Sequence, residues 1–256
     1  IKMIIYFFLF ILSFIVRLIK LDQSLWLDEG ASVMFSHLPI DQFWQSLRGD
    51  FHPPLYYLAL RFINLYFGNN LIYFRLFSVL IGSLTVVVFA SLLKLIFINT
   101  SLGRGKFRLP LYLAGGLLLS LNPLHVYYSQ EIRMYALSAL LSVLSWRLLI
   151  RPNNVKLLGH FLVNLLGIFT FYPLIFNLVS QIVYLIFVDR RSLPKVLWYS
   201  FISLFIFLPW LPIFLDQLKG GGYLASSLSG WGNLSGIVSL KSLILIAIKF
   251  QIGRIS

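Results

Sequence analysis

The strongest constraint on this chain is a series of long apolar runs that charged residues interrupt only briefly. A hydrocarbon core about 30 Å thick is crossed by about 20 apolar helical residues. Of the 256 residues, 59% are hydrophobic and 11% are charged, against about 25% charged in an ordinary soluble domain. We therefore expect an all-α, polytopic transmembrane helical bundle, and a soluble enzyme is excluded. The expected spans are residues 3–19, 72–98, 109–126, 134–150, 157–171, 172–188 and 196–215, with 240–250 as an additional candidate.

Lysine and arginine gather in three short segments between these apolar runs. The positive-inside rule places such clusters on the cytoplasmic side of a membrane. The net charge of +13 has the same explanation, so we expect no nucleic-acid partner. The chain is predicted to be a multi-pass protein of the plasma (inner) membrane. The three clusters are Arg104, Lys106 and Arg108, then Arg147, Arg151 and Lys156, then Arg190, Arg191 and Lys195.

Residues 20–71 are predicted to form a long first outer loop. The apolar stretch 54–67 has only 14 residues, about 21 Å as a helix. A crossing there would put the cluster at Arg104 on the wrong side of the membrane. We expect 30–38, 40–48 and 54–67 to be helices that lie on the outer membrane face.

The chain has eight carboxylates, and this topology turns seven of them outward. Five fall within residues 22–50, and only Asp189 faces inward. The avoidance of apolar spans by acidic residues does not explain why they gather in one loop. With no cysteine in the sequence, thiolate metal sites and cysteine nucleophiles are excluded. The carboxylates are Asp22, Asp28, Glu29, Asp41, Asp50, Glu131, Asp189 and Asp216.

The adjacent acids Asp28 and Glu29 are the sharpest feature. They follow an apolar segment, residues 25–27, that we expect at the headgroup level. Two neighbouring, partly desolvated carboxylates form a setting suited to a general base. The alternative is a pair of acids favoured by the dipole at a helix N-terminus.

Two further polar segments lie in predicted outer loops. Asp50 and His52 precede two prolines, a pattern typical of a capped helix start, although His52 could also carry a proton or contact phosphate. Glu131, Arg133 and Tyr135 fill a short turn between two spans, where they either mark the membrane interface or contribute to a site. His125 and His160 fall in or near apolar spans and favour a role in packing.

At these residues the sequence resembles the polytopic, lipid-donor glycosyltransferases of the GT-C class. The branch it resembles is the bacterial protein-mannosyltransferase-like and aminoarabinose-transferase-like one (glycosyltransferase family 39/83-like). The motifs occur in order over residues 5–215, and a departure is Ile132, where alanine is common. They are Trp26-Leu27-Asp28-Glu29, His52-Pro53-Pro54-Leu55-Tyr56-Tyr57, Phe74-Arg75-Leu76-Phe77-Ser78-Val79-Leu80-Ile81-Gly82, Asn122-Pro123 through Tyr135-Ala136, and Leu208-Pro209-Trp210-Leu211-Pro212.

The resemblance implies an inverting transfer of a sugar from a polyprenyl-phosphate donor to an acceptor on the outer face. Asp28 matches the expected base, while Glu29 is its motif neighbour and Glu131 matches the acidic region of the second outer loop. Arg133, with His52, would contact the phosphate. Asp50 and Tyr135 complete the expected substrate-binding set.

Further expectations concern cofactors, partners and chain length. Asp28 and Glu131 could together hold a divalent metal, although no ligand spacing indicates one, and no other cofactor is expected. The partners are the lipid donor, membrane lipid and an acceptor that could be a protein, lipid or glycan. We expect a single domain, residues 1–256, that lacks the C-terminal spans typical of the family.

Two functions of other classes stay open at the sequence level. A lipid or solute transporter (flippase) would favour ionisable residues near the bilayer midplane and broken helices. A non-catalytic membrane scaffold would not require clustered outer carboxylates. Within the enzyme class, a polymer ligase that uses a polyprenyl donor is the nearest alternative.

Overall fold

The computed structural model describes residues 2–97 and 111–227, and over these ranges the chain is all-helical, without strands. The expected span 240–250 and the basic cluster at Arg104, Lys106 and Arg108 lie outside the described residues. The helices are α1 (Lys2–Leu18), α2 (Leu27–His37), α3 (Ile40–Leu47), α4 (Leu55–Phe67), α5 (Leu71–Phe97), α6 (Leu111–Leu121), α7 (Pro123–Tyr128), α8 (Tyr135–Leu149), α9 (Asn154–Thr170), α10 (Leu174–Val188), α11 (Leu193–Phe207), the 3₁₀ turn η2 (Leu208–Trp210) and α12 (Leu211–Ser227).

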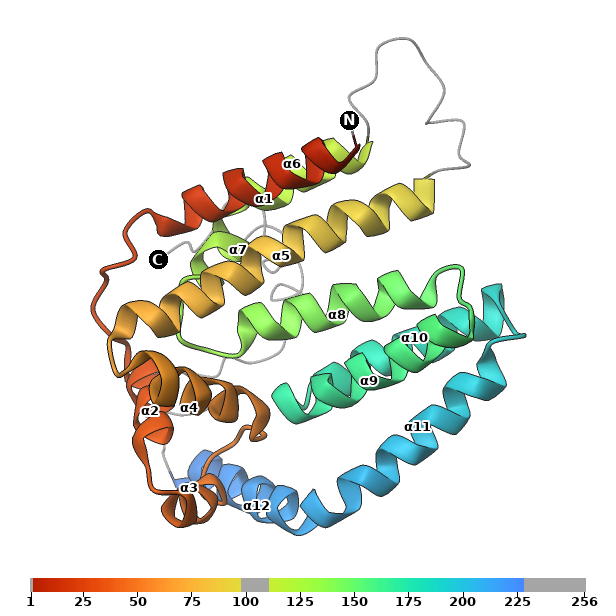
Figure 1. Cartoon of the computed structure of the whole chain (residues 1–256). Coiled ribbons are helices and arrows are strands. Elements are labelled where there is room, and N and C mark those ends of the chain that lie inside the picture. The colour runs from red at the N-terminus through yellow and green to blue at the C-terminus, as the bar shows by residue number, and fades with distance from the viewer. Residues whose placement is uncertain (1, 98–110, 228–256) are drawn as a thin grey trace.

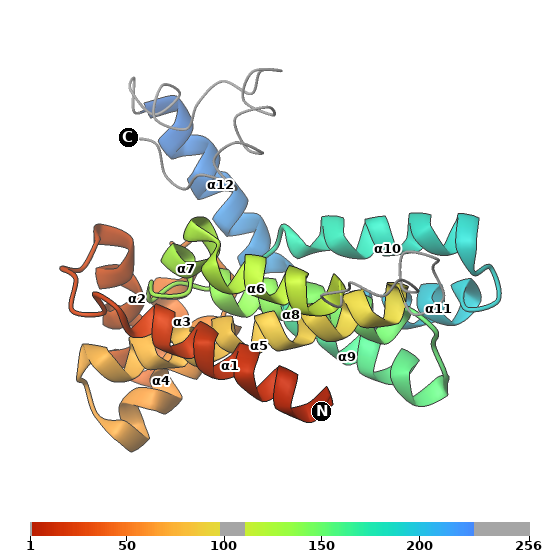
Figure 2. The same cartoon turned by 90° about the horizontal axis from the view of Figure 1, so that it is seen from above.

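The long helices lie side by side along one direction (Figure 1). Helices α1, α5, α6, α8, α9, α10 and α11 make up this layer, and α2, α3 and α4 gather at one end of it in both views (Figures 1 and 2). The turns at residues 150–153 and 189–192 lie at the opposite end. The acidic first loop and the two described basic clusters are therefore separated by the length of the helices.

Two stretches are long and apolar enough to cross a membrane, Leu71–Phe97 and Leu193–Gly220. The other apolar helices of the described chain have 10–17 residues. The expected span 109–126 is wrong in its length, because α6 ends at Leu121. Asn122 accepts a hydrogen bond from the His125 N–H and begins α7, so the helix is broken. By length and composition alone, two helices indicate membrane association.

The three helices expected in the first loop are present. The predicted ranges 30–38, 40–48 and 54–67 correspond to α2, α3 and α4. Proline sets the helix starts, because Pro39 and Pro54 occupy the residues immediately before α3 and α4. The apolar sides of these helices pack on one another in a core that includes Phe35, Phe43, Leu47, Tyr57 and Leu60.

Glycine is required where α5 meets the turn that follows α7. A Cβ atom added to Gly82 would collide with the Ser129 side chain and lie 3.2 Å from the Arg17 Nε. The Ser129 hydroxyl in turn donates to the His125 carbonyl at 2.5 Å. The absence of a side chain at Gly82 therefore lets the turn at residues 129–134 approach α5.

Substitution of Gly82 by alanine should destabilise the fold, because the new methyl group displaces Ser129. We expect a loss of about 1–3 kcal/mol, typical of overpacking. The measurement is the thermal midpoint of the detergent-purified protein. Gly220→Ala is the control, since an added Cβ there would meet no atom within 4 Å and alanine favours helix. Equal midpoints for Gly82→Ala and wild type would contradict the close approach.

Candidate functional site

A buried glutamate joins three separate segments of the chain. Glu29 is 2% exposed. Its Oε2 accepts the Trp26 N–H at 3.1 Å and its Oε1 accepts the Ile132 N–H at 2.8 Å. The Arg75 Nη2 lies 3.4 Å from Oε2 and completes an ion pair. Because each partner comes from a different segment, Glu29 fixes α2 against both α5 and the second turn, residues 129–134.

Arg75 extends this connection to the start of the first loop. Its Nη1 donates to the carbonyl oxygens of Leu21 and Gln23, each at 2.6 Å. Arg75 is 4% exposed, so its charge needs the Glu29 carboxylate. Glu29, which the sequence placed with the catalytic groups, therefore has its carboxylate occupied by structural contacts.

Asp28, the preceding residue in the chain, is turned the other way. Its side chain is 70% exposed, and its Oδ2 lies 3.9 Å from the Arg133 Nη2. The Glu29 carboxylate is thus buried among its partners, whereas the Asp28 carboxylate is accessible. The accessible carboxylate is the one that could take a proton from a bound group.

Arg133 is a buried cation whose hydrogen-bond contacts are long. It is 6% exposed, and its guanidinium lies 3.3 Å from the Asp28 carbonyl oxygen, 3.4 Å from the Ser32 Oγ and 3.4 Å from the His52 Nε2. Its Nε has no hydrogen-bond partner among the described residues. The Tyr135 ring centre lies 5.9 Å from the guanidinium carbon. Tyr135 also hydrogen-bonds Arg133, and the unpartnered Nε and the long contacts of the guanidinium leave donors that can accept an anion.

The environment keeps Arg133 charged. Burial alone would lower the pKa of Arg133, but the neighbouring Tyr57, Tyr135 and Asp28 raise it above its usual value. A permanent positive charge is therefore present beside the exposed Asp28 carboxylate.

His52 contacts the Arg133 guanidinium, and Asp50 in turn contacts His52. The Tyr57 hydroxyl donates to the Asp50 Oδ2 at 2.6 Å, and the His52 Nδ1 lies 3.4 Å from the same oxygen. Burial alone would raise the pKa of Asp50, but hydrogen bonds from His52 and Tyr57 and the charge of His52 hold it below its usual value. The Phe171 ring stacks on His52 with 6.4 Å between centroids.

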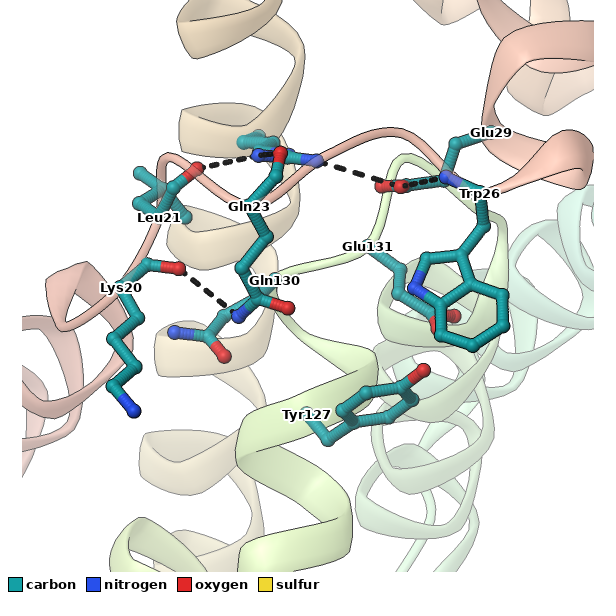
Figure 3. A pocket seen from close by; sticks show the side chains of 9 residues that line it. Lys20, Leu21, Gln23, Trp26, Glu29, Tyr127, Gln130 and Glu131 are labelled. Atoms are coloured by element: carbon teal, nitrogen blue, oxygen red, sulfur yellow. Dashed lines mark hydrogen bonds and ion pairs between the residues drawn. The ribbon is translucent and has the colours of Figure 1, made fainter.

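Five of the seven predicted site residues line one cavity of about 260 Å³, whereas Asp50 and His52 lie outside its lining. It is lined by Asp28, Glu29, Glu131, Arg133 and Tyr135, together with aromatic side chains of the two turns. A smaller hollow of about 10 Å³, the size of one water molecule, adjoins it through shared walls (Figure 3). The aromatic side chains that line the 260 Å³ cavity, besides Tyr135, are Trp26, Tyr127 and Tyr128.

Two apolar hollows lie along α7 and α6, near the polar cavity of 260 Å³. One, of about 150 Å³, shares Tyr128 and Tyr135 with it and is lined by Leu124 and Ala139. The other, of about 440 Å³, begins at Pro123 and is lined by leucines of α6. The polar cavity is thus bordered by apolar space on the side of these helices.

Sequence reasoning assigned no role to Arg75, Ser32 or Tyr57. Arg75 had a readable signal, because a lone arginine at the start of an apolar run needs a buried partner. Ser32 and Tyr57 had none, since their contacts depend on how α2 and α4 pack. In the parts of the chain that the structure describes, no three acidic or histidine side chains come together as metal ligands. Comparisons with protein-family models, characterised proteins and solved structures found no match.

The contrast between Glu29 and Asp28 can be tested with isosteric amides. Glu29→Gln leaves the buried Arg75 without its counter-charge, so we expect a loss of about 3 kcal/mol. Asp28→Asn changes an exposed group and should alter stability by less than about 0.5 kcal/mol. Unfolding of both variants, followed in detergent beside wild type, measures the difference. Similar losses for the two variants would contradict their opposite orientations.

Asp50 should make the stability of the folded protein depend on pH in the acidic range. Its pKa in the folded protein lies below its usual value, so its stabilising contribution is fully present above the unfolded pKa and is lost as pH falls through the folded value. Thermal midpoints between about pH 6 and pH 3 should therefore fall more steeply for wild type than for Asp50→Asn. The exposed Asp41→Asn serves as control and should follow wild type. A wild-type slope in Asp50→Asn would contradict the prediction.

Proposed function

We propose that this chain is a multi-pass membrane protein with the cavity on its outer side. Its burial pattern supports this, because large apolar side chains cover the outside of the long helices. Phe7, Phe176, Phe187 and Trp198 are 60–79% exposed, whereas Arg17 is 0% exposed. Such a surface is unfavourable in water and suits lipid. The shorter helices would cross by tilting or by local thinning of the bilayer.

The distribution of charge supports the same orientation. The clusters at Arg151 and Arg190 occupy one end of the helices, and the first loop occupies the other (Figure 1). Cytoplasmic basic clusters would leave the cavity facing outward. The proposed location is the plasma membrane.

We further propose that the cavity is the active site of an inverting glycosyltransferase that uses a polyprenyl-phosphate sugar. The observation that carries this is Arg133, a buried cation in the same cavity as the exposed Asp28 carboxylate. A phosphate leaving group needs a fixed positive charge, and an acceptor hydroxyl needs a base. The cavity brings both within one ligand-sized space.

The proposed reaction is a single displacement. An acceptor hydroxyl oxygen attacks the anomeric carbon of the donor, its proton passes to the Asp28 carboxylate, and the bond from that carbon to the phosphate oxygen breaks. The electron pair leaves with the polyprenyl phosphate, whose charge Arg133 stabilises. Glu131, which lines the same cavity, would orient the acceptor.

The remaining predicted residues take supporting roles in this proposal. The Tyr135 ring packs against Arg133, the His52 Nε2 lies 3.4 Å from the Arg133 Nη2, and Asp50 contacts His52. Glu29 positions Asp28 through the backbone of α2. A divalent metal is not required by this assignment, and Asp28 and Glu131 are the carboxylates that could hold one.

The apolar hollows support a lipid-linked donor rather than a soluble one. The 150 Å³ hollow adjoins the polar cavity through Tyr128 and Tyr135, and the 440 Å³ hollow lies further along the chain at α6. A polyprenyl chain could lie there while its phosphate reaches Arg133. This route also explains why a polar cavity would open beside helices covered with apolar side chains.

The transferase proposal predicts separate effects for Asp28 and Arg133. Asp28→Asn should lower turnover by about 100-fold or more, as expected for loss of a general base, with donor affinity nearly unchanged. Arg133→Gln should weaken donor binding by about tenfold or more, because it removes a charge-assisted contact. The probes are polyprenyl-phosphate mannose and polyprenyl-phosphate aminoarabinose, tested for binding and for sugar release.

Asp22→Asn, an exposed acid of the same loop, is the matched control and should behave as wild type. Near wild-type turnover in Asp28→Asn would show that another group is the base. If folded wild-type protein bound neither donor, the transferase proposal would fail and the transporter interpretation would replace it.

A further inference from the structure

A second polar cluster lies at the end of the helices opposite the cavity. The Lys94 Nζ is 5.9 Å from the centre of the Tyr6 ring and 5.7 Å from that of Tyr112. The Arg147 Nε donates to the Ser91 Oγ at 2.8 Å, and Ser91 also hydrogen-bonds Tyr6. The cluster therefore joins α1, α5, α6 and α8 around two cations.

No carboxylate of the described chain is available to these cations. Helices α1, α5, α6 and α8 contain no aspartate or glutamate. Seven of the eight carboxylates of the chain belong to the first loop, the second turn or α12, which lie at the cavity end of the helices. The eighth, Asp189, accepts a hydrogen bond from Ser192. Among the residues that the structure describes, neither Lys94 nor Arg147 forms an ion pair.

The two side chains are also only partly exposed. Removing a charge from water without a counter-ion is costly, and cation–π contacts with tyrosines offset part of that cost. An anion from outside the chain would complete the cluster. Two cations with tyrosine and serine hydroxyls beside them match the oxygen atoms of a phosphate group.

We propose that Lys94 and Arg147 bind the phosphate of an anionic phospholipid in the cytoplasmic leaflet. A lipid is favoured over free phosphate because exposed apolar side chains, Met3, Phe7 and Ile96, lie near the cluster on the same helices and could contact acyl chains. Basic pockets between membrane helices on the cytoplasmic side bind anionic headgroups in this way. The inference depends on the proposed membrane orientation and is independent of the transferase activity.

The experiment measures lipid retention by the whole chain. Detergent-purified protein is titrated with phosphatidylglycerol and with phosphatidylcholine, and bound lipid is counted by native mass spectrometry. We expect wild type to bind one phosphatidylglycerol at least tenfold more tightly than phosphatidylcholine. Lys94→Gln/Arg147→Gln should lose this preference. Arg190→Gln/Arg191→Gln removes the same charge from exposed residues at the same end and should keep it.

Three results would overturn the proposal. The first is a wild-type protein without preference for the anionic lipid, a result that needs no variant to fold. The second is an equal loss in the two double variants, which would indicate only general surface charge. The third is displacement of the lipid by millimolar inorganic phosphate, which would make free phosphate the ligand. Donor binding at Arg133, measured in parallel, reports on the transferase proposal separately.

Discussion

The buried ion pair of Glu29 and Arg75 is the contact on which the candidate site depends. It is formed between residues 46 positions apart, and Glu29 also accepts the backbone N–H of Ile132, 103 positions away. These contacts bring the start of α2 and the turn before α8 to the same place. Asp28 and Arg133 then face each other because each is next to a residue that is fixed.

The second organising feature is the separation of charge along the helices. Seven of the eight acidic residues lie at one end, where Arg75 and Arg133 neutralise part of their charge. At the other end, Lys94 and Arg147 have no acidic partner within the described structure. An aqueous protein would gain little from such a division, whereas a membrane gives each end a different environment. The proposed transferase site and the proposed lipid site are both consequences of this arrangement.

Much of this organisation could be predicted from the sequence, and the exceptions have physical causes. Apolar periodicity and the two prolines that follow His52 predicted helices of the first loop, because these signals are local. Adjacent acids at 28 and 29 could not be told apart, since their burial depends on Arg75 from a distant helix. The end of α6 had a local signal, the Asn122-Pro123 pair, but the continuing apolar composition favoured one longer span. The family resemblance stays an expectation, so the assigned reaction is a proposal.

The orientation of the chain in a membrane can be tested directly, because the sequence contains no cysteine. Single cysteines at Asn69, after α4, and at Val155, in the first turn of α9, would occupy exposed positions at opposite ends of the helices. Intact cells are treated with a membrane-impermeant maleimide, before and after permeabilisation. We expect Asn69→Cys to be labelled in intact cells and Val155→Cys to be labelled only after permeabilisation. Labelling of both cysteines from the same side would contradict the proposed orientation.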